Sequence, residues 1–138
     1  MPRLLGLDPG AVRCGVAVTN SAASMAFPRP ALKSDATFLS VLAALVEEEG
    51  VATIVVGRPI ALSGNETSST LHADVLFAAI VDAFPQMNVV QWDERLTTFQ
   101  AQRSLLQAGV RAKDQREHLD SAAAVIMLQN YVDGLHVD

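Results

Sequence analysis

The sequence predicts a single α/β domain in which helices cover the faces of one mixed β-sheet. Its 138 residues, half of them hydrophobic, suit one compact core. Three strand-like segments come first, and helical and strand-like segments alternate after them, which is typical of a mixed sheet. No repeat or shift in composition marks a boundary, so the expected domain spans residues 1–138.

The first three elements are predicted strands. Residues 2–7 are apolar on both alternating faces, as in a central strand, and lead directly into Asp8. The Pro-Gly pair that follows favours a type II turn, so residues 12–19 should return as an antiparallel partner. Residues 21–33 contain two prolines, which favour an edge strand.

A helix and a buried strand are expected next. Ser34 is a predicted N-cap for a helix over residues 35–49, and Gly50 is its expected stop. Residues 51–57 form a short β-branched run, which is typical of a strand inside a parallel sheet.

The second half of the chain should contain three more helices and one strand. Ser63 and Glu66 have capping-box spacing for a helix that ends before Pro85. A strand is expected over residues 87–92. The remaining predicted helices run from Thr97 to Gly109 and over residues 115–133, with Gly134 beyond the end.

Composition narrows the classes of function. Ten Lys and Arg against fifteen Asp and Glu give a net charge of −5, so any contact with nucleic acid must be local. The one cysteine, Cys14, excludes an internal disulfide and a cysteine-rich zinc site, and we expect it in the core. No apolar run reaches the length of a signal-peptide core or a membrane span, so we expect a soluble cytoplasmic protein with no membrane partner.

Three carboxylates occupy positions where a sheet brings catalytic groups together. Asp8 ends the first strand, and either Asp93 or Glu94 ends the last one. Asp120 stands on the inner face of the last helix, where a core residue belongs. Each acid alone has an ordinary explanation, but three together repel one another unless a cation compensates them. Oxygen ligands select Mg²⁺ or Mn²⁺, and two such ions are a known arrangement for phosphodiester cleavage, so the acids predict a metal-dependent nuclease.

Basic residues are concentrated beside these acids. Half of the ten Lys and Arg residues lie between positions 95 and 116, where only Asp114 opposes them. Such a segment is either a solvated surface or a rim that contacts phosphates without reading sequence, and its position favours the rim. Two further arginines follow strand–turn junctions. The predicted phosphate-binding residues are Arg13, Arg58, Arg95, Arg103, Arg111, Lys113 and Arg116.

Four ordered motifs resemble the YqgF (RuvX) family of Holliday junction resolvase-like nucleases over almost the whole chain. The motifs are Gly6-Leu7-Asp8-Pro9-Gly10 with Arg13, Gly15 and Ala17; Val55-Val56-Gly57-Arg58-Pro59; Asp93-Glu94-Arg95-Leu96-Thr97-Thr98; and Asp120-Ser121-Ala122-Ala123-Ala124 with Leu128-Gln129. The resemblance implies a ribonuclease H-like fold with a five-stranded sheet of order 3-2-1-4-5, in which strand 2 is antiparallel. It also implies maturation of the 5′ end of 16S ribosomal RNA, or junction resolution.

The resemblance places the family's catalytic, metal-binding acids on Asp8, Glu94 and Asp120. Two Mg²⁺ or Mn²⁺ ions are the expected cofactors. The chain departs from the family at Asn20, where an acid is common, and at Arg58, where a small apolar residue is common. Ala123 stands where related resolvases can carry a further acid. The lack of this acid would weaken the binding of one ion.

Other functions fit parts of the sequence. A Holliday junction resolvase would act on DNA and ask for a two-fold dimer, while an RNA-binding or assembly protein would keep the sheet without cleaving. Actin-like ATPases also open with a Gly-x-Asp-x-Gly hairpin, but they need a second lobe that 138 residues do not supply. The sequence leaves open whether the partner is ribosomal RNA or branched DNA, and whether the protein is a monomer or a homodimer.

Overall fold

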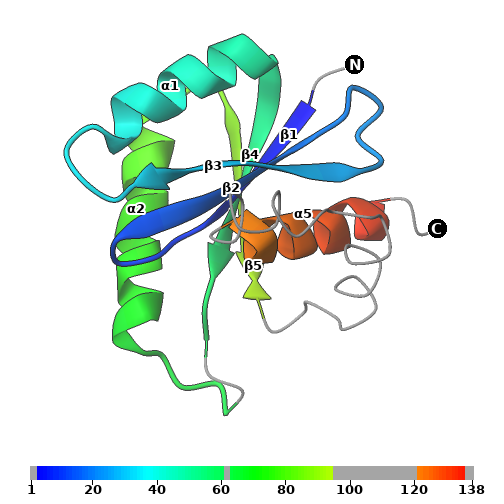
Figure 1. The fold of residues 1–138 in the computed structure, drawn as a ribbon. Coiled ribbons are helices and arrows are strands. Elements are labelled where there is room, and N and C mark those ends of the chain that lie inside the picture. The colour runs from blue at the N-terminus through cyan, green and yellow to red at the C-terminus, as the bar shows by residue number, and fades with distance from the viewer. Residues whose placement is uncertain (1–2, 61–62, 95–120, 136–138) are drawn as a thin grey trace.

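The computed structural model describes residues 3–60, 63–94 and 121–135 of the chain. Five strands in these ranges form one sheet in the order β3-β2-β1-β4-β5 (Figure 1). The strands are β1 (Arg3–Asp8), β2 (Arg13–Thr19), β3 (Ala26–Lys33), β4 (Val51–Arg58) and β5 (Asn88–Asp93). Strand β2 is antiparallel to both β1 and β3, whereas β1, β4 and β5 are mutually parallel. The predicted α/β class and strand order are therefore confirmed.

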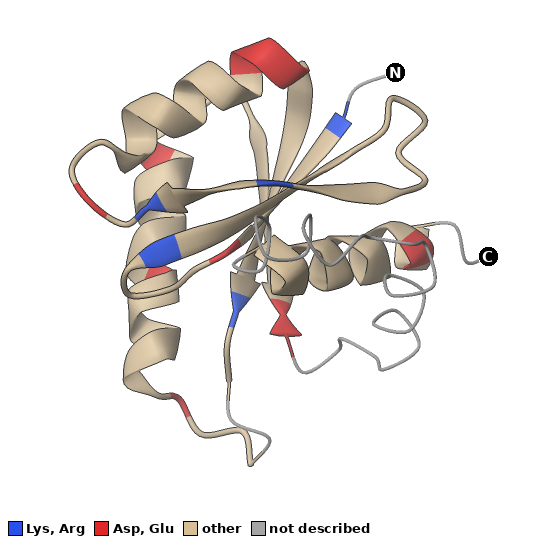
Figure 2. Ribbon diagram, viewed as in Figure 1, with Lys and Arg blue, Asp and Glu red and all other residues tan. Residues whose placement is uncertain are grey.

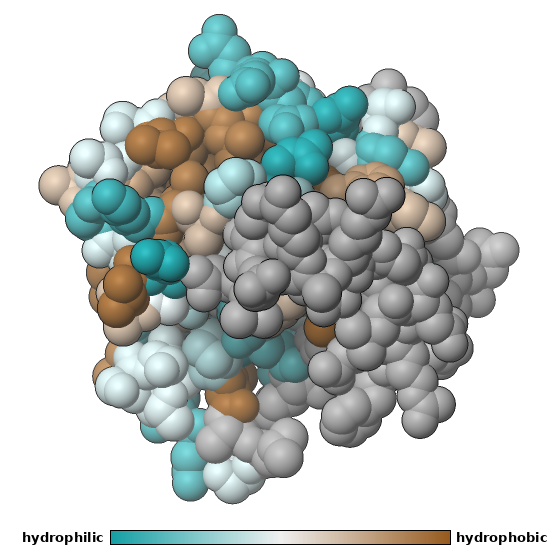
Figure 3. All heavy atoms as spheres, in the orientation of Figure 1, coloured by the Kyte–Doolittle hydropathy of each residue, from teal (hydrophilic) through white to brown (hydrophobic). Residues whose placement is uncertain are grey.

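Helices cover both faces of the sheet, as predicted. Helices α1 (Phe38–Glu49) and α2 (Ser68–Ala83) lie on one face, and α5 (Ala122–Leu135) lies on the other (Figure 1). In the space-filling view, hydrophobic residues are visible between α1 and β3 (Figure 3). No helix within the described ranges is long and apolar enough to cross a membrane.

The two faces of the sheet carry separate apolar clusters, because successive strand residues point in opposite directions. In β1, Leu5 and Leu7 join the cluster beneath α1 and α2, whereas Leu4 joins the cluster beneath α5. Gly6 also faces α5, because a Cβ there would meet Leu128. The same alternation places Asp8 on the α5 face, at the end of β1.

The connections between the first strands differ from the prediction. A type II turn needs a positive φ at Gly10, but the described glycines with positive φ are Gly50 and Gly64. A glycine is needed at position 10 for another reason, because a Cβ there would collide with the backbone oxygen of Arg13. Strand β3 starts at Ala26 and not near residue 21, because the preceding residues form a turn that hydrogen-bonds to Asn20.

Two predicted helix caps are wrong because their side chains bond elsewhere. The hydroxyl of Ser34 donates to the Gly10 carbonyl oxygen at 2.8 Å, and α1 begins only after Thr37. Helix α2 begins with a capping box between Thr67 and Thr70, while Glu66 binds Arg58. The predicted stop at Gly50 is confirmed by its left-handed conformation.

The later elements are shifted or only partly described. Strand β5 covers Asn88–Asp93, one residue later than predicted, and α5 continues through Gly134 to Leu135. The predicted helix between Thr97 and Gly109 and the predicted start of the last helix lie outside the described residues.

Candidate active site

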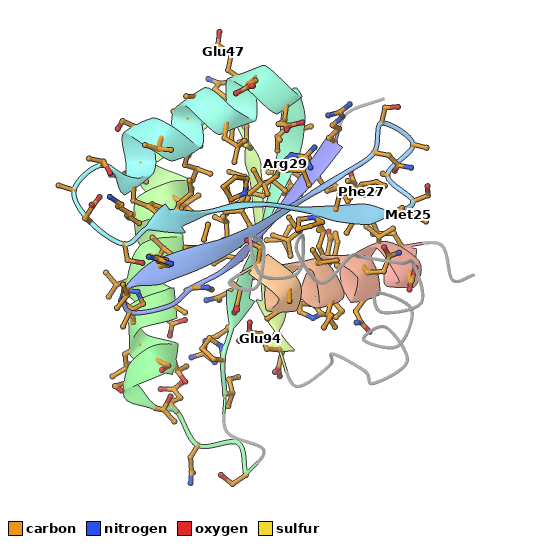
Figure 4. All side chains as sticks on the ribbon, in the orientation of Figure 1. Met25, Phe27, Arg29, Glu47 and Glu94 are labelled. Atoms are coloured by element: carbon orange, nitrogen blue, oxygen red, sulfur yellow. The ribbon has the colours of Figure 1, made fainter. Side chains whose placement is uncertain are left out.

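The site centres on two carboxyl groups that meet across an intervening strand. Asp8 ends β1, and Glu94 directly follows β5, with β4 paired between them. Because neighbouring strands lie about 4.8 Å apart, the two backbones are separated by roughly 10 Å. The side chains nevertheless form a hydrogen bond. The structure thus joins two of the three predicted acids, and Glu94, which is labelled in Figure 4, is the carboxyl that interacts with Asp8.

Gly57 of β4 provides the space for this contact. A Cβ at this position would stand 2.7 Å from Glu94 Oε1 and 2.8 Å from Met127 Sδ, both too close for real atoms. Any side chain here would therefore displace the Glu94 carboxyl. The Val55–Pro59 motif contains this glycine, but the sequence alone does not reveal its role, because that role depends on which strand lies between the two acids.

The Asp8–Glu94 pair is electrostatically unusual. Burial, the hydrogen bond with Asp8 and the charges of Asp8 and Asp93 raise the pKa of Glu94 well above its usual value of 4.5. In the absence of a cation the Glu94 carboxyl holds a proton at neutral pH, because burial and the neighbouring Asp8 charge raise its pKa to about 9. A pair of this kind can hold a proton or, in its place, a cation.

Cys14 of β2 lies in the core close to both acids. Its side chain is fully buried, as predicted, and burial together with the charges of Asp8 and Glu94 raises the pKa of the thiol far above its usual value. A thiol held neutral is a poor nucleophile and a poor metal ligand. The chemistry of the site therefore comes from its oxygen atoms.

The start of α5 is tied to the sheet by Ser121, a residue that the sequence analysis did not single out. Its buried hydroxyl accepts a hydrogen bond from the Val16 amide at 2.9 Å and donates one to the Arg29 carbonyl oxygen at 2.7 Å. These bonds bridge β2 and β3 where their pairing is irregular. Asp120, the third predicted acid, precedes Ser121 in the chain but lies outside the described residues. Within the described ranges no three acid, histidine or cysteine side chains form a metal-binding group.

The predicted phosphate-binding residues occupy different surroundings. Arg13 is exposed at the start of β2, directly opposite Lys33 of β3, and these two basic segments lie side by side in Figure 2. Arg58 instead binds both carboxylate oxygens of Asp74 in α2 and reaches Glu66 at 2.8 Å. These acids raise the pKa of its guanidinium. The other five, Arg95, Arg103, Arg111, Lys113 and Arg116, lie outside the described residues.

Of the departures from the family pattern, Asn20 lies away from the acid pair, whereas Arg58 directly follows Gly57 in β4. Asn20 follows β2 at the end of the sheet opposite Asp8, where its side-chain oxygen accepts hydrogen bonds from the amides of Ser24 and Met25. Ala123 is exposed on α5. An amide at position 20 therefore organises a turn and does not remove a ligand from the Asp8–Glu94 pair.

Comparison with solved structures defines the class of fold. Thermus thermophilus RuvC bound to a Holliday junction superposes with a TM-score of 0.62 over 100% of this chain and 99% of that protein, at 13% sequence identity. The fowlpox virus resolvase bound to junction DNA gives a TM-score of 0.63 over 98% and 99% of the two chains, at 12% identity. The chain thus has the fold of these resolvases.

Sequence comparison then identifies the family. The chain belongs to the RuvX family, described as Holliday junction resolvase, which it matches over residues 2–134. A relative from Mycolicibacterium paratuberculosis is 44% identical over 95% of this chain and 80% of its own length. A relative from Corynebacterium jeikeium is 37% identical over 95% and 86% of the two chains. Both relatives are named "Putative pre-16S rRNA nuclease".

Proposed function

We propose that this chain is a divalent-metal-dependent nuclease whose catalytic centre lies on the α5 face, where β1 and β5 end. The observation that carries the proposal is the contact between the carboxyl groups of Asp8 and Glu94. Apolar side chains of similar volume would pack there without the free-energy cost of burying two acids together. The pair is therefore best explained by the ligand that it can bind.

The donors of this pair fit a hard cation. Carboxylate oxygens are the ligands that Mg²⁺ and Mn²⁺ prefer, and a cation can replace the proton on Glu94. Asp120 is the proposed third ligand and third catalytic acid. When bound, two such ions supply Lewis-acid stabilisation for phosphodiester cleavage. The residues of this chain hold and orient those ions, and Gly57 keeps the Glu94 carboxyl free to take part.

The proposed phosphate contacts come from the basic residues around the acids. Arg13 is exposed at the start of β2, one strand from Asp8. Arg58 binds a phosphate only in competition with Asp74 and Glu66, which both contact its guanidinium. The basic segment makes up the remainder of the proposed rim, with Arg95, Arg103, Arg111, Lys113 and Arg116.

Precursor 16S ribosomal RNA is the proposed substrate, processed at its 5′ end in the cytoplasm, because the relatives at 37–44% identity carry that substrate in their names. Branched DNA is the second candidate, favoured by the family description and by the fold shared with junction resolvases. Symmetric cutting of a junction needs a homodimer with paired sites, whereas RNA processing is open to a monomer.

The test is cleavage by an Asp8→Asn variant, with a precursor 16S RNA fragment and a four-way DNA junction as parallel substrates. The amide keeps the size of the side chain and removes its charge, so we expect cleavage with Mg²⁺ or Mn²⁺ to fall by about 10²-fold or more while the melting temperature stays near that of the wild type. Asp82→Asn, an exposed change on α2, is the matched control and should leave cleavage unchanged. An Asp8→Asn protein that cuts RNA at the wild-type rate would overturn the proposal. A wild-type protein that binds RNA but cuts neither substrate would favour the non-catalytic alternative.

A further inference from the structure

Two cations stand directly opposite each other at the edge of the sheet nearest the β1–β2 hairpin. Arg13 of β2 and Lys33 of β3 are register partners, and both side chains are exposed. Opposite residues of an antiparallel pair have Cβ atoms about 5 Å apart. The register of β2 and β3 therefore brings two positive charges close together.

This basic pair lies on the same face of the sheet as the acids. The neighbouring register pair, Cys14 and Leu32, points into the core beneath α1 and α2, so Arg13 and Lys33 point to the opposite, α5 face. Asp8 pairs with Gly15, which has no side chain to separate the acid from the basic pair. At this end of the sheet, the acids thus lie at the ends of β5 and β1, and the cations lie on β2 and β3.

The backbone around the pair is held by long-range hydrogen bonds. The Ser34 amide donates to the Val12 carbonyl oxygen at 2.9 Å, and the Ser34 hydroxyl donates to the Gly10 carbonyl oxygen. These bonds fasten the β1–β2 hairpin to the residue after β3. The register that places Arg13 opposite Lys33 is consequently held by the fold before any ligand arrives.

We propose that Arg13 and Lys33 form a phosphate-binding subsite that holds the nucleic-acid backbone on the β2–β3 side of the acid pair. The inference rests on the proposed nuclease function and adds to it Lys33 and the direction in which the bound strand runs. A phosphodiester has two free oxygens, so one phosphate can accept hydrogen bonds from both side chains. The strand bound here passes from the acids across β1 and β2 toward β3.

The first test measures RNA binding in an Asp8→Asn background, so that no cleavage interferes. Lys33→Gln should weaken binding of a precursor 16S RNA fragment and lower the slope of log K against log salt by about 0.7 to 1. Lys33→Arg should keep the slope. Ser40→Glu on α1 changes the net charge equally on the opposite face and should leave the slope unaltered.

The second test locates the phosphate. In a series of RNAs that each carry one uncharged methylphosphonate linkage, a single position should weaken binding of the Lys33-containing protein clearly more than binding of Lys33→Gln, which keeps only Arg13 at that phosphate. If Lys33→Gln keeps the wild-type slope, or every linkage weakens both proteins equally, the subsite does not exist. If Lys33→Gln behaves as expected but the wild type cleaves nothing, the subsite stands and the nuclease proposal fails.

Discussion

The contact between Asp8 and Glu94 depends on the missing side chain of Gly57, so Gly57→Ala is a direct perturbation of the site. The added methyl would lie 2.7 Å from Glu94 Oε1 and 2.8 Å from Met127 Sδ, whereas ordinary contact starts at 3.4 Å. Both atoms belong to flexible side chains, which must retreat by about 0.6 to 0.7 Å. Crowding of this size typically costs about 1–3 kcal/mol of stability. Displacement of a catalytic group on the order of 1 Å can cost about 10²-fold in rate.

Gly6→Ala is the matched control because it crowds the same face without touching Glu94. A Cβ at Gly6 would stand 3.0 Å from Leu128 Cβ and 3.2 Å from Met127 Cε. We therefore expect both variants to lose stability in urea unfolding, and only Gly57→Ala to lose Mg²⁺-dependent cleavage when assayed well below its melting temperature. Equal cleavage rates for Gly57→Ala, Gly6→Ala and the wild type would refute the role assigned to the carboxyl contact.

Two further predictions concern the parts of the fold that surround the site. Glu49 at the end of α1 binds Arg3 at 2.6 Å and Arg29 at 2.7 Å, and the hydrogen bond from Arg29 is the largest cause that lowers the pKa of Glu49. Glu49 therefore stabilises the fold above its unfolded pKa of about 4.5, and this contribution is lost as the pH falls through the lower folded value. Glu49→Gln should cost about 1 kcal/mol at pH 7 in urea titrations and progressively less in acid, and a gap that is independent of pH would contradict this. Ser121→Ala should cost about 1–3 kcal/mol and speed hydrogen exchange of the Val16 amide, because that amide and the Arg29 carbonyl lose their shared hydroxyl; unchanged exchange would argue against the bridge.

The strands could be predicted because they carry strong local signals, whereas their order in the sheet was implied by the family resemblance. Residues 51–57 are an uninterrupted β-branched run after a glycine stop, and the observed β4 differs by one residue. The caps could not be predicted equally well, because a serine hydroxyl takes whichever acceptor the folded chain provides. For Ser34 that acceptor is the carbonyl of Gly10, a residue brought near by the sheet and not by the sequence.

The candidate site was predictable in its acids and not in its supporting residues. Asp8 and Glu94 end parallel strands, and parallel strands place their carboxyl ends at one edge. The role of Gly57 depends on the strand that separates the acids, and the proposed role of Lys33 depends on the register between strands. The role of Ser121 depends on a bridge from α5 to the sheet. These relations cannot be predicted from the spacing of residues along the chain.

Gly57 and Arg58 are neighbours in β4 that point to opposite faces of the sheet and have different roles. Gly57 faces α5 and leaves room for the acids, while Arg58 faces the other side and binds Asp74, which also accepts a hydrogen bond from Gln91 of β5. A phosphate beside the acids would have to compete with two carboxylates for Arg58 and approach it around the end of the sheet. Lys33 and Arg13 already face the acids' side, so a strand bound across β1 and β2 approaches their charge without passing around the end of the sheet. Among the described residues, we therefore expect the positive charge beside the acid pair to come from β2 and β3.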